Sequence, residues 1–235
     1  MAIASMAITL AALVISPTIQ ATPVPTSPDP TSHAQAAAHF EELIRRGTAG
    51  FNDWDCRPTK FHPNPLVLVH GTLVNALTNW FYMAPRFVAE GYCVFALTYG
   101  QHPAIPIVYG LTAMEKSAQQ LSEFVDKVLN ATGADKVDMV GHSQGSLMPR
   151  YWMKNLGGAS KIRKFAGIGS IQYGTNLLGL IPFLESLGLY DPIKKLVDPI
   201  CESCFQFFTN STFINDLNRD GDTLPGIDYL MIASK

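Results

Sequence analysis

The stretch Gly141-His142-Ser143-Gln144-Gly145 has the pattern G-x-S-x-G, and it decides how the rest of the sequence is interpreted. The residues Lys136–Val140 before it are typical of a short strand, and Leu147–Leu156 after it are typical of a helix. A glycine two residues to either side of the serine allows a tight strand-to-helix turn without a Cβ clash. The pattern therefore predicts that this turn holds the Ser143 hydroxyl above a sheet, where it can act as a nucleophile.

The order of apolar and polar segments predicts an α/β fold. Runs with strand character are Leu66–Val69, Cys93–Leu97, Val137–Val140, Phe165–Ile168 and Ile227–Ala233. Helical patterns lie between them: one is expected over Trp80–Glu90, and another follows the capping-box residues Thr112–Glu115 and ends at Gly133. Strands that alternate with helices favour a mainly parallel sheet with helices on both faces.

The segment Asn176–Phe208 breaks this alternation. Leucine, isoleucine and phenylalanine side chains crowd between prolines and glycines there. One interpretation is a helical excursion packed on the core. The other is a cap whose apolar side faces an acyl chain or a lipid surface. The two interpretations are compatible, and both predict a helical, cap-like insertion in the sheet domain.

The N-terminal fifth of the chain predicts export. Ile3–Ile15 is almost wholly apolar and too short to span a membrane. It suits the hydrophobic region of a signal peptide, which we place at residues 1–21. Residues 22–50 include a stretch rich in proline, threonine and serine and are expected to form a linker or propeptide. The folded domain is then expected over residues 51–235, in a secreted protein.

Four cysteines fit an oxidising compartment. Cys56 and Cys93 are spaced to close a loop between the segment that enters the domain and a core strand. Cys201 and Cys204 form a CxxC pair, which indicates a local disulfide; zinc binding is the alternative, but no second pair accompanies it. No metal site is predicted.

Two further features concern the surface. Asn130-Ala131-Thr132 and Asn210-Ser211-Thr212 are glycosylation sequons, which become occupied only in a eukaryotic host. The net charge is −2 and no basic run occurs, so nothing in the charge pattern indicates binding to nucleic acid.

The residues around Ser143 predict acyl transfer. The backbone N–H of Gln144 is the expected first donor to an oxyanion, and the N–H of Thr72, in the loop after the first core strand, is the expected second donor. A serine also needs a base that accepts its proton. All six histidines, however, precede or adjoin the serine: 33, 39, 62, 70, 102 and 142. We expect His142 to pack within the turn and His70 to orient the oxyanion loop.

From Trp54 to Lys235 the chain resembles the secreted bacterial and fungal class 2 lipases, which have the α/β-hydrolase fold. The matching stretches are Asn52–Cys56, Pro63–Thr72, Gly91–Gly100, Val137–Gly145, Met148–Tyr151, Tyr173–Thr175 and Cys201–Cys204. The resemblance implies hydrolysis of carboxylic esters, of acylglycerols above all, without a cofactor. It also implies that Ser143 is the nucleophile and supports the disulfides Cys56–Cys93 and Cys201–Cys204.

The sequence departs from the family pattern in two places. Ser146 stands where the family usually has a second glycine. The last predicted strand should lead to a catalytic Asp and then a His, but the sequence ends at Lys235, before either position. Asp216, Asp220, Asp222 and Asp228 follow Ser143 and none of them matches the acid position. The catalytic Asp and His are therefore not assigned, and we expect a domain that is incomplete at its C-terminus.

Three functions follow from these observations. The first is a lipase or esterase that acts on acylglycerols or related lipid esters, with transient contact to a lipid interface. The second is a catalytically inactive or truncated homologue, such as a lipid-binding remnant. The third is a thioesterase or acyltransferase, against which the leader and the cysteines argue because they indicate an extracellular protein.

Overall fold

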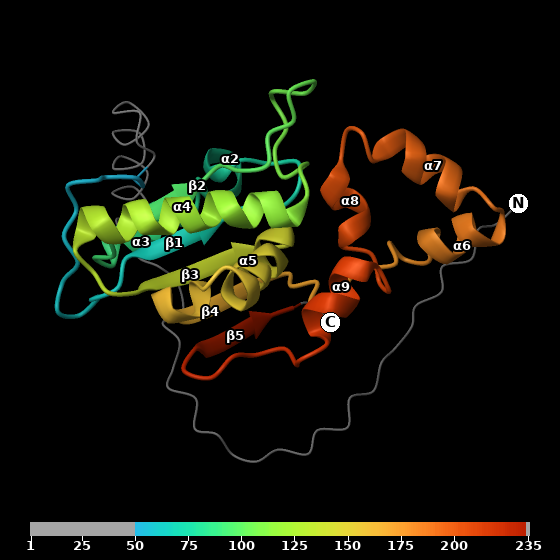
Figure 1. Ribbon diagram of the computed structural model, residues 1–235. Helices are drawn as coiled ribbons and strands as arrows, with labels where there is room; N and C mark the ends of the chain where they lie inside the picture. The colour runs from blue at the N-terminus through green and yellow to red at the C-terminus, as the bar shows by residue number, and fades with distance from the viewer. Residues whose placement is uncertain (1–49, 234–235) are drawn as a thin grey trace, which may run out of the picture.

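The computed structural model describes residues 50–233 (Figure 1). The predicted signal peptide at 1–21 and all but the last residue of the predicted linker at 22–50 lie outside the described residues. The elements in the first half are β1 (Leu66–Val69), α2 (Ala76–Trp80), α3 (Ala84–Ala89), β2 (Val94–Leu97), α4 (Met114–Thr132), β3 (Val137–His142) and α5 (Gln144–Asn155). Those in the second half are the 3₁₀ helix η1 (Gly158–Lys161), β4 (Ile162–Ile168), α6 (Leu180–Ser186), α7 (Tyr190–Val197), α8 (Glu202–Gln206), α9 (Thr212–Asn218) and β5 (Asp228–Ile232).

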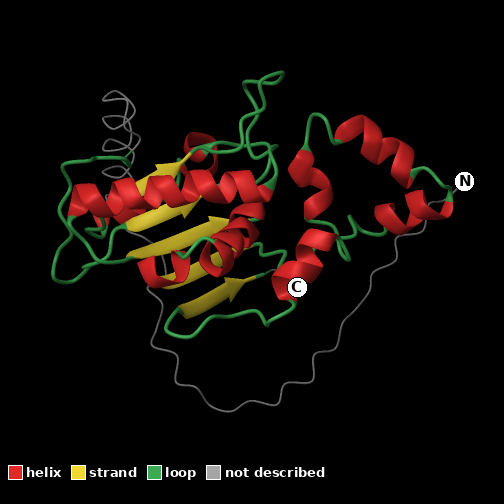
Figure 2. Ribbon diagram, viewed as in Figure 1, coloured by secondary structure: helices red, strands yellow, loops and turns green. Residues whose placement is uncertain are grey.

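The five strands form one sheet in the order β2-β1-β3-β4-β5, and every neighbouring pair is parallel. Figure 2 shows the strands as a single layer, with α4 and α5 across its near face. This arrangement confirms the predicted α/β class. The carboxyl ends of β1 and β3 lie side by side, because Val69 pairs with Gly141, and the loop after β1 therefore lies beside Ser143.

Alternation along the strands divides the core between the two faces of the sheet. Val67 and Val69 of β1 pack in a cluster with α4 and α5, which includes the buried Trp152. Leu66 and Leu68 point to the other face and pack with α2 and α3. Helices thus cover both faces, as predicted. On the second face the cover ends before β5, where Leu230 and Ile232 are 58% and 49% exposed.

The cap-like insertion has a small core of its own. Ile181, Phe205 and Phe208 are buried against one another and against side chains of α7, including Tyr190 and Ile193. No residue of α7 itself is buried. Figure 1 shows α6 and α7 standing apart from the sheet, joined to it through α8 and α9. The predicted helical insertion is therefore present, and much of its apolar surface is open.

Two local predictions were wrong. The helix expected over Trp80–Glu90 is divided, because α2 ends at Trp80 and α3 begins at Ala84 with Pro85 in its first turn. A proline lacks the N–H that a continuous helix would use, so it starts a helix better than it continues one. The capping box at Thr112 does not form either: Ala113 is the N-cap of α4 and makes no side-chain cap.

Candidate active site

Ser143 lies at the junction between β3 and α5, in a backbone conformation that non-glycine residues rarely adopt. Its φ and ψ are 53° and −121°. Such a conformation costs about 1–3 kcal/mol and persists only where the surroundings impose it. Here the Ser143 N–H donates to Ile168 O at 2.9 Å, and the Ser146 N–H and hydroxyl donate to Ser143 O at 2.8 and 2.6 Å. These bonds hold the strained serine between β4 and the first turn of α5.

The two glycines of the pattern are required by space. A Cβ on Gly141 would lie 1.9 Å from Gly145 O, and a Cβ on Gly145 would lie 2.2 Å from Val69 O. The positive φ of the turn falls on Ser143 and not on these glycines. The glycines therefore let α5 approach the ends of β1 and β3, and this approach forces the serine into its unusual conformation.

The loop after β1 packs directly on the serine. A Cβ on Gly71 would lie 3.1 Å from Ser143 Cβ. The next residue, Thr72, donates its hydroxyl to Gln144 Oε1 at 2.5 Å. The two candidate oxyanion donors, Thr72 and Gln144, are thus joined through their side chains. The N–H of Gln144 is also the first of α5, and the first N–H groups of a helix have no partner within it and carry a partial positive charge.

Neither nearby histidine contacts the serine hydroxyl. His142 is half-buried, and its Nδ1 lies 2.8 Å from Asn79 Oδ1 in α2. The same oxygen accepts the Gly71 N–H at 3.2 Å, so Asn79 connects the turn to the loop after β1. Desolvation lowers the pKa of His142. Within residues 50–233 the Ser143 hydroxyl makes no hydrogen bond.

His70 is fully buried and both of its ring nitrogens are occupied. Nδ1 donates to Gly71 O at 2.7 Å, and Nε2 accepts the Tyr99 N–H at 3.2 Å. The ring stacks on Tyr99, whose hydroxyl donates to His70 O at 2.8 Å. One donating and one accepting nitrogen describe a neutral imidazole. Burial lowers the pKa of His70 from 6.5 to about 4. His70 therefore holds the loop after β1 to Tyr99, and neither ring nitrogen is free for Ser143.

The low pKa of His70 predicts a loss of stability in mild acid. In the unfolded chain His70 binds a proton near pH 6.5, while the folded chain stays neutral down to about pH 4. Its contribution to stability is complete above pH 6.5 and falls as the pH decreases toward 4. We expect protonation of His70 in the unfolded chain to lower the free energy of unfolding by roughly 2 kcal/mol between pH 7 and pH 5. Urea unfolding of His70→Gln should show a weaker pH dependence. The half-buried His62 provides the control: if His62→Gln flattens the profile equally, the interpretation fails.

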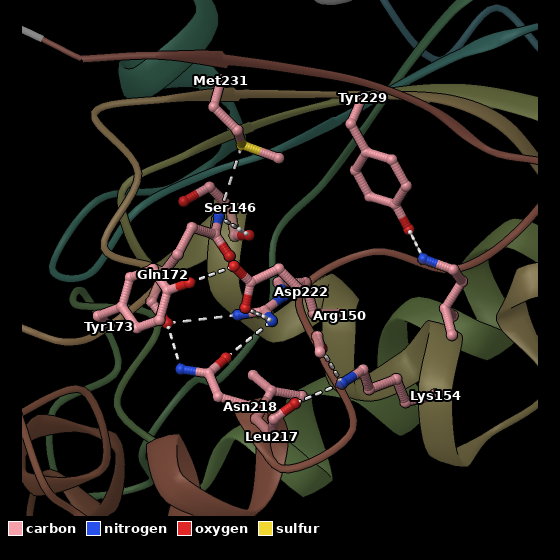
Figure 3. Close-up of polar contacts among 12 residues, drawn as sticks. Ser146, Arg150, Lys154, Gln172, Tyr173, Leu217, Asn218, Asp222, Tyr229 and Met231 are labelled. Carbon is pink, nitrogen blue, oxygen red and sulfur yellow. Dashed lines mark hydrogen bonds and ion pairs between the residues drawn. The ribbon is translucent and has the colours of Figure 1, made fainter.

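A polar cluster surrounds Arg150 of α5 (Figure 3). Its guanidinium is almost fully buried and donates to Gln172 O at 3.3 Å and Asn218 Oδ1 at 2.8 Å. Asp222 lies 3.5 Å from it and accepts the hydroxyl of Tyr173. Asp222, which follows Ser143 in the chain, is thus engaged by other side chains, those of Arg150 and Tyr173. The same holds for Asp216, paired with Arg219, and for Asp228, paired with Arg163.

The cysteine pairs are both disulfides, as predicted. Cys56 bonds to Cys93, and Cys201 bonds to Cys204. The CxxC pair is therefore not a thiolate pair for zinc, and no group of three or more metal-ligating side chains occurs in the part of the chain that is described. The two sequons differ in setting: Asn210 is in an exposed loop, whereas the Thr132 hydroxyl of the other sequon is buried and donates to Val128 O at 2.8 Å within α4. Their glycosylation stays a prediction.

A parallel sheet whose central strand turns through a strained serine into a helix is the arrangement of the α/β-hydrolase fold. Two solved structures have a similar fold. The mature lipase BlEst2 of Bacillus licheniformis has a TM-score of 0.55 and 16% identity, over 74% of this chain and 66% of that one. Lipase B of Aspergillus fumigatus has a TM-score of 0.55 and 16% identity, over 74% of this chain and 39% of that one. The protein therefore has the α/β-hydrolase fold.

The chain belongs to the family Lipase (class 2), whose model matches residues 63–235. It is 32% identical over 92 residues to a triacylglycerol lipase of Pseudarthrobacter phenanthrenivorans, over 37% of this chain and 27% of that protein. A triacylglycerol lipase of Burkholderia plantarii is also 32% identical over 92 residues, over 37% of this chain and 24% of that protein. The matched region thus spans about a quarter of the length of these two relatives.

Proposed function

We propose that this protein is a serine carboxylic-ester hydrolase of the lipase or esterase type, with Ser143 as its nucleophile. The observation that carries the proposal is the strained conformation of Ser143 at the start of α5, with Gly71 packed against it. Family membership supports the reaction class, and the names of the two curated relatives support acylglycerols or related lipid esters as substrates. Both disulfides support action outside the cell.

In the proposed reaction the Ser143 oxygen attacks the ester carbonyl while a base accepts the hydroxyl proton. The carbonyl oxygen becomes an oxyanion, which the N–H groups of Thr72 and Gln144 stabilise; each donor is worth roughly 3 kcal/mol in the transition state. The C–O bond to the alcohol then breaks, and the alcohol leaves with the proton. Water cleaves the acyl-enzyme in the same way, which releases the acid and restores the serine. No cofactor is required. The base is not assigned to any described residue.

Exposed apolar residues of the insertion support contact with a lipid interface. Leu178 is fully exposed, and Leu196 and Phe183 are 75% and 58% exposed. Within residues 50–233 no helix is both long and apolar enough to cross a membrane. Because of the exposed apolar side chains we include a transient contact with a lipid surface in the proposal. Flotation with phosphatidylcholine vesicles tests it, and equal flotation of a Leu178→Ser, Leu196→Ser double variant would count against it.

Labelling of the purified chain with a fluorophosphonate probe tests the nucleophile, because the probe reacts with activated serines. We expect one labelled site, which disappears in Ser143→Ala and persists in Ser160→Ala, an exposed serine elsewhere on the surface. A folded chain that takes no label would overturn the proposal for this chain and favour the non-catalytic alternative. Where labelling occurs, turnover of p-nitrophenyl esters against the matching thioesters separates an ester hydrolase from a thioesterase.

A further inference from the structure

Ser203 is a buried residue of α8, far from Ser143 in sequence, whose contacts lead back to the oxyanion loop. Its side chain is fully buried, and in sequence it lies between the disulfide partners Cys201 and Cys204. Its hydroxyl donates to Gly110 O at 2.6 Å, and its N–H donates to Leu111 O at 3.1 Å. We propose that Ser203 is a positioning residue for the oxyanion loop and acts through the segment Tyr109–Leu111. This inference rests on the proposed function, in which that loop binds the oxyanion.

The segment Tyr109–Leu111 packs directly on the oxyanion loop. The Leu73 N–H donates to Tyr109 O at 2.9 Å. A Cβ on Gly110 would lie 3.2 Å from Thr72 Cα and 3.5 Å from Gln144 Oε1, so a residue with a side chain at this position would press against both candidate oxyanion residues. Leu73 has a φ of 69°, a left-handed conformation that is unfavourable for leucine. The bond from Leu73 to Tyr109 therefore holds a strained residue immediately after Thr72.

The same segment is held between two supports. On one side the Gly110 and Leu111 N–H groups donate to Tyr99 O at 2.9 Å and Gly100 O at 2.8 Å, at the end of β2. On the other side the Gly110 and Leu111 carbonyl groups accept the two bonds from Ser203. Without the Ser203 hydroxyl the Gly110 carbonyl loses its side-chain donor in a buried site, where an unpaired polar group is costly. On the α8 side the segment would then keep only the backbone bond from the Ser203 N–H to Leu111 O.

α8 is itself fixed to the start of α4. Glu202 Oε2 accepts the Ala113 N–H at 2.9 Å, and Gln206 Oε1 accepts the Met114 N–H at 2.7 Å. These are N–H groups at a helix start, which need partners from outside the helix. Lys116 pairs with Glu202 at 3.0 Å and adds an exposed contact. α8 thus takes the place of the missing capping box of α4 and presents Ser203 to Gly110 in a fixed position.

Amide hydrogen exchange in Ser203→Ala tests the positioning directly and requires no catalysis. We expect the Leu73 and Gly110 amides to exchange at least about tenfold faster, since a buried hydrogen bond is lost on one side of the segment. Ser160→Ala is the matched control, because the Ser160 hydroxyl also donates to a glycine carbonyl, Gly157 O at 3.0 Å, but on the surface. Unchanged exchange at Leu73 and Gly110 in folded Ser203→Ala overturns the proposal.

Fluorophosphonate labelling then separates positioning from simple structural support. We expect the maximal labelling rate of Ser143 to fall about tenfold, with the half-saturating probe concentration unchanged. The reason is that a misplaced oxyanion donor weakens stabilisation of the transition state and not binding of the probe. Faster exchange with unchanged labelling would overturn the catalytic role. If the unsubstituted chain takes no label, the proposed function fails for this chain, and exchange alone decides whether Ser203 positions the loop. If Ser203→Ala does not fold, Gln206→Met loosens α8 by removing its bond to Met114, and about threefold faster exchange at Leu73 is expected.

Discussion

Gly145→Ala is expected to destabilise the protein by about 3 kcal/mol or more, although alanine is the better helix former. Gly145 is the second residue of α5, a position where the substitution would ordinarily be neutral or stabilising. Here the new Cβ would lie 2.2 Å from Val69 O and 2.5 Å from His70 O. Both atoms belong to the backbone at the end of β1, so no side chain can rotate away. The clash can be removed only if α5 moves away from the sheet, or if the oxyanion loop moves away from Ser143.

Urea unfolding at pH 7 measures this effect, and Gly133→Ala is the matched control. Gly133 is also at the end of a helix, as the C-cap of α4. A Cβ there would meet nothing within 4 Å, but the φ of 70° would strain an alanine. The control therefore isolates the cost of a left-handed backbone, about 1–2 kcal/mol, from the cost of a steric clash. If Gly145→Ala is no less stable than Gly133→Ala, close packing of α5 on β1 is not what the glycine provides.

Much of the sheet could be predicted from the sequence because each strand is a short apolar run. Leu66–Val69 was expected in full, and the run at 165–168 was found as the end of β4, which begins at Ile162. The first half of β4 was missed because Arg163 and Lys164 are exposed and interrupt the apolar pattern. The apolar pattern of a sequence identifies the residues that are buried. It therefore locates the core better than it locates the ends of a hydrogen-bonded strand.

The candidate site was predictable where its residues lie in a recognisable local pattern, as around Ser143 and in the loop that carries His70 and Thr72. The pattern around Ser143 specifies a turn, a helix and the N–H of Gln144 within a few residues. Asn79, which joins Gly71 to His142, lies in a short helix with no sequence signal of its own. Ser203 was visible only as the third residue of a CxxC segment. Such contacts depend on how separate elements pack, and local propensity contains no information about that packing.

Removal of the Cys56–Cys93 disulfide is expected to cost roughly 4 kcal/mol, against about 2 kcal/mol for Cys201–Cys204. The difference follows from loop length, since the two bonds join residues 37 and 3 positions apart. A longer closed loop removes more freedom from the unfolded chain. The double variants Cys56→Ala, Cys93→Ala and Cys201→Ala, Cys204→Ala can be compared by urea unfolding under identical conditions.

The native state should change little in the first variant, because other contacts hold the same segment. Asn52 donates its N–H to Val94 O at 2.9 Å, and its side chain exchanges two hydrogen bonds with Ala96 at 2.8 and 3.0 Å. Trp54 packs on Phe95, with ring centroids 5.1 Å apart. We therefore expect fluorophosphonate labelling of Ser143, where it occurs, to survive loss of Cys56–Cys93. Removal of the Cys201–Cys204 disulfide, which closes the shorter loop, should have the opposite result. We expect a small loss in the free energy of unfolding but faster amide exchange at Leu73, because α8 supports the oxyanion loop. Equal stability losses in the two variants would contradict the loop-length argument.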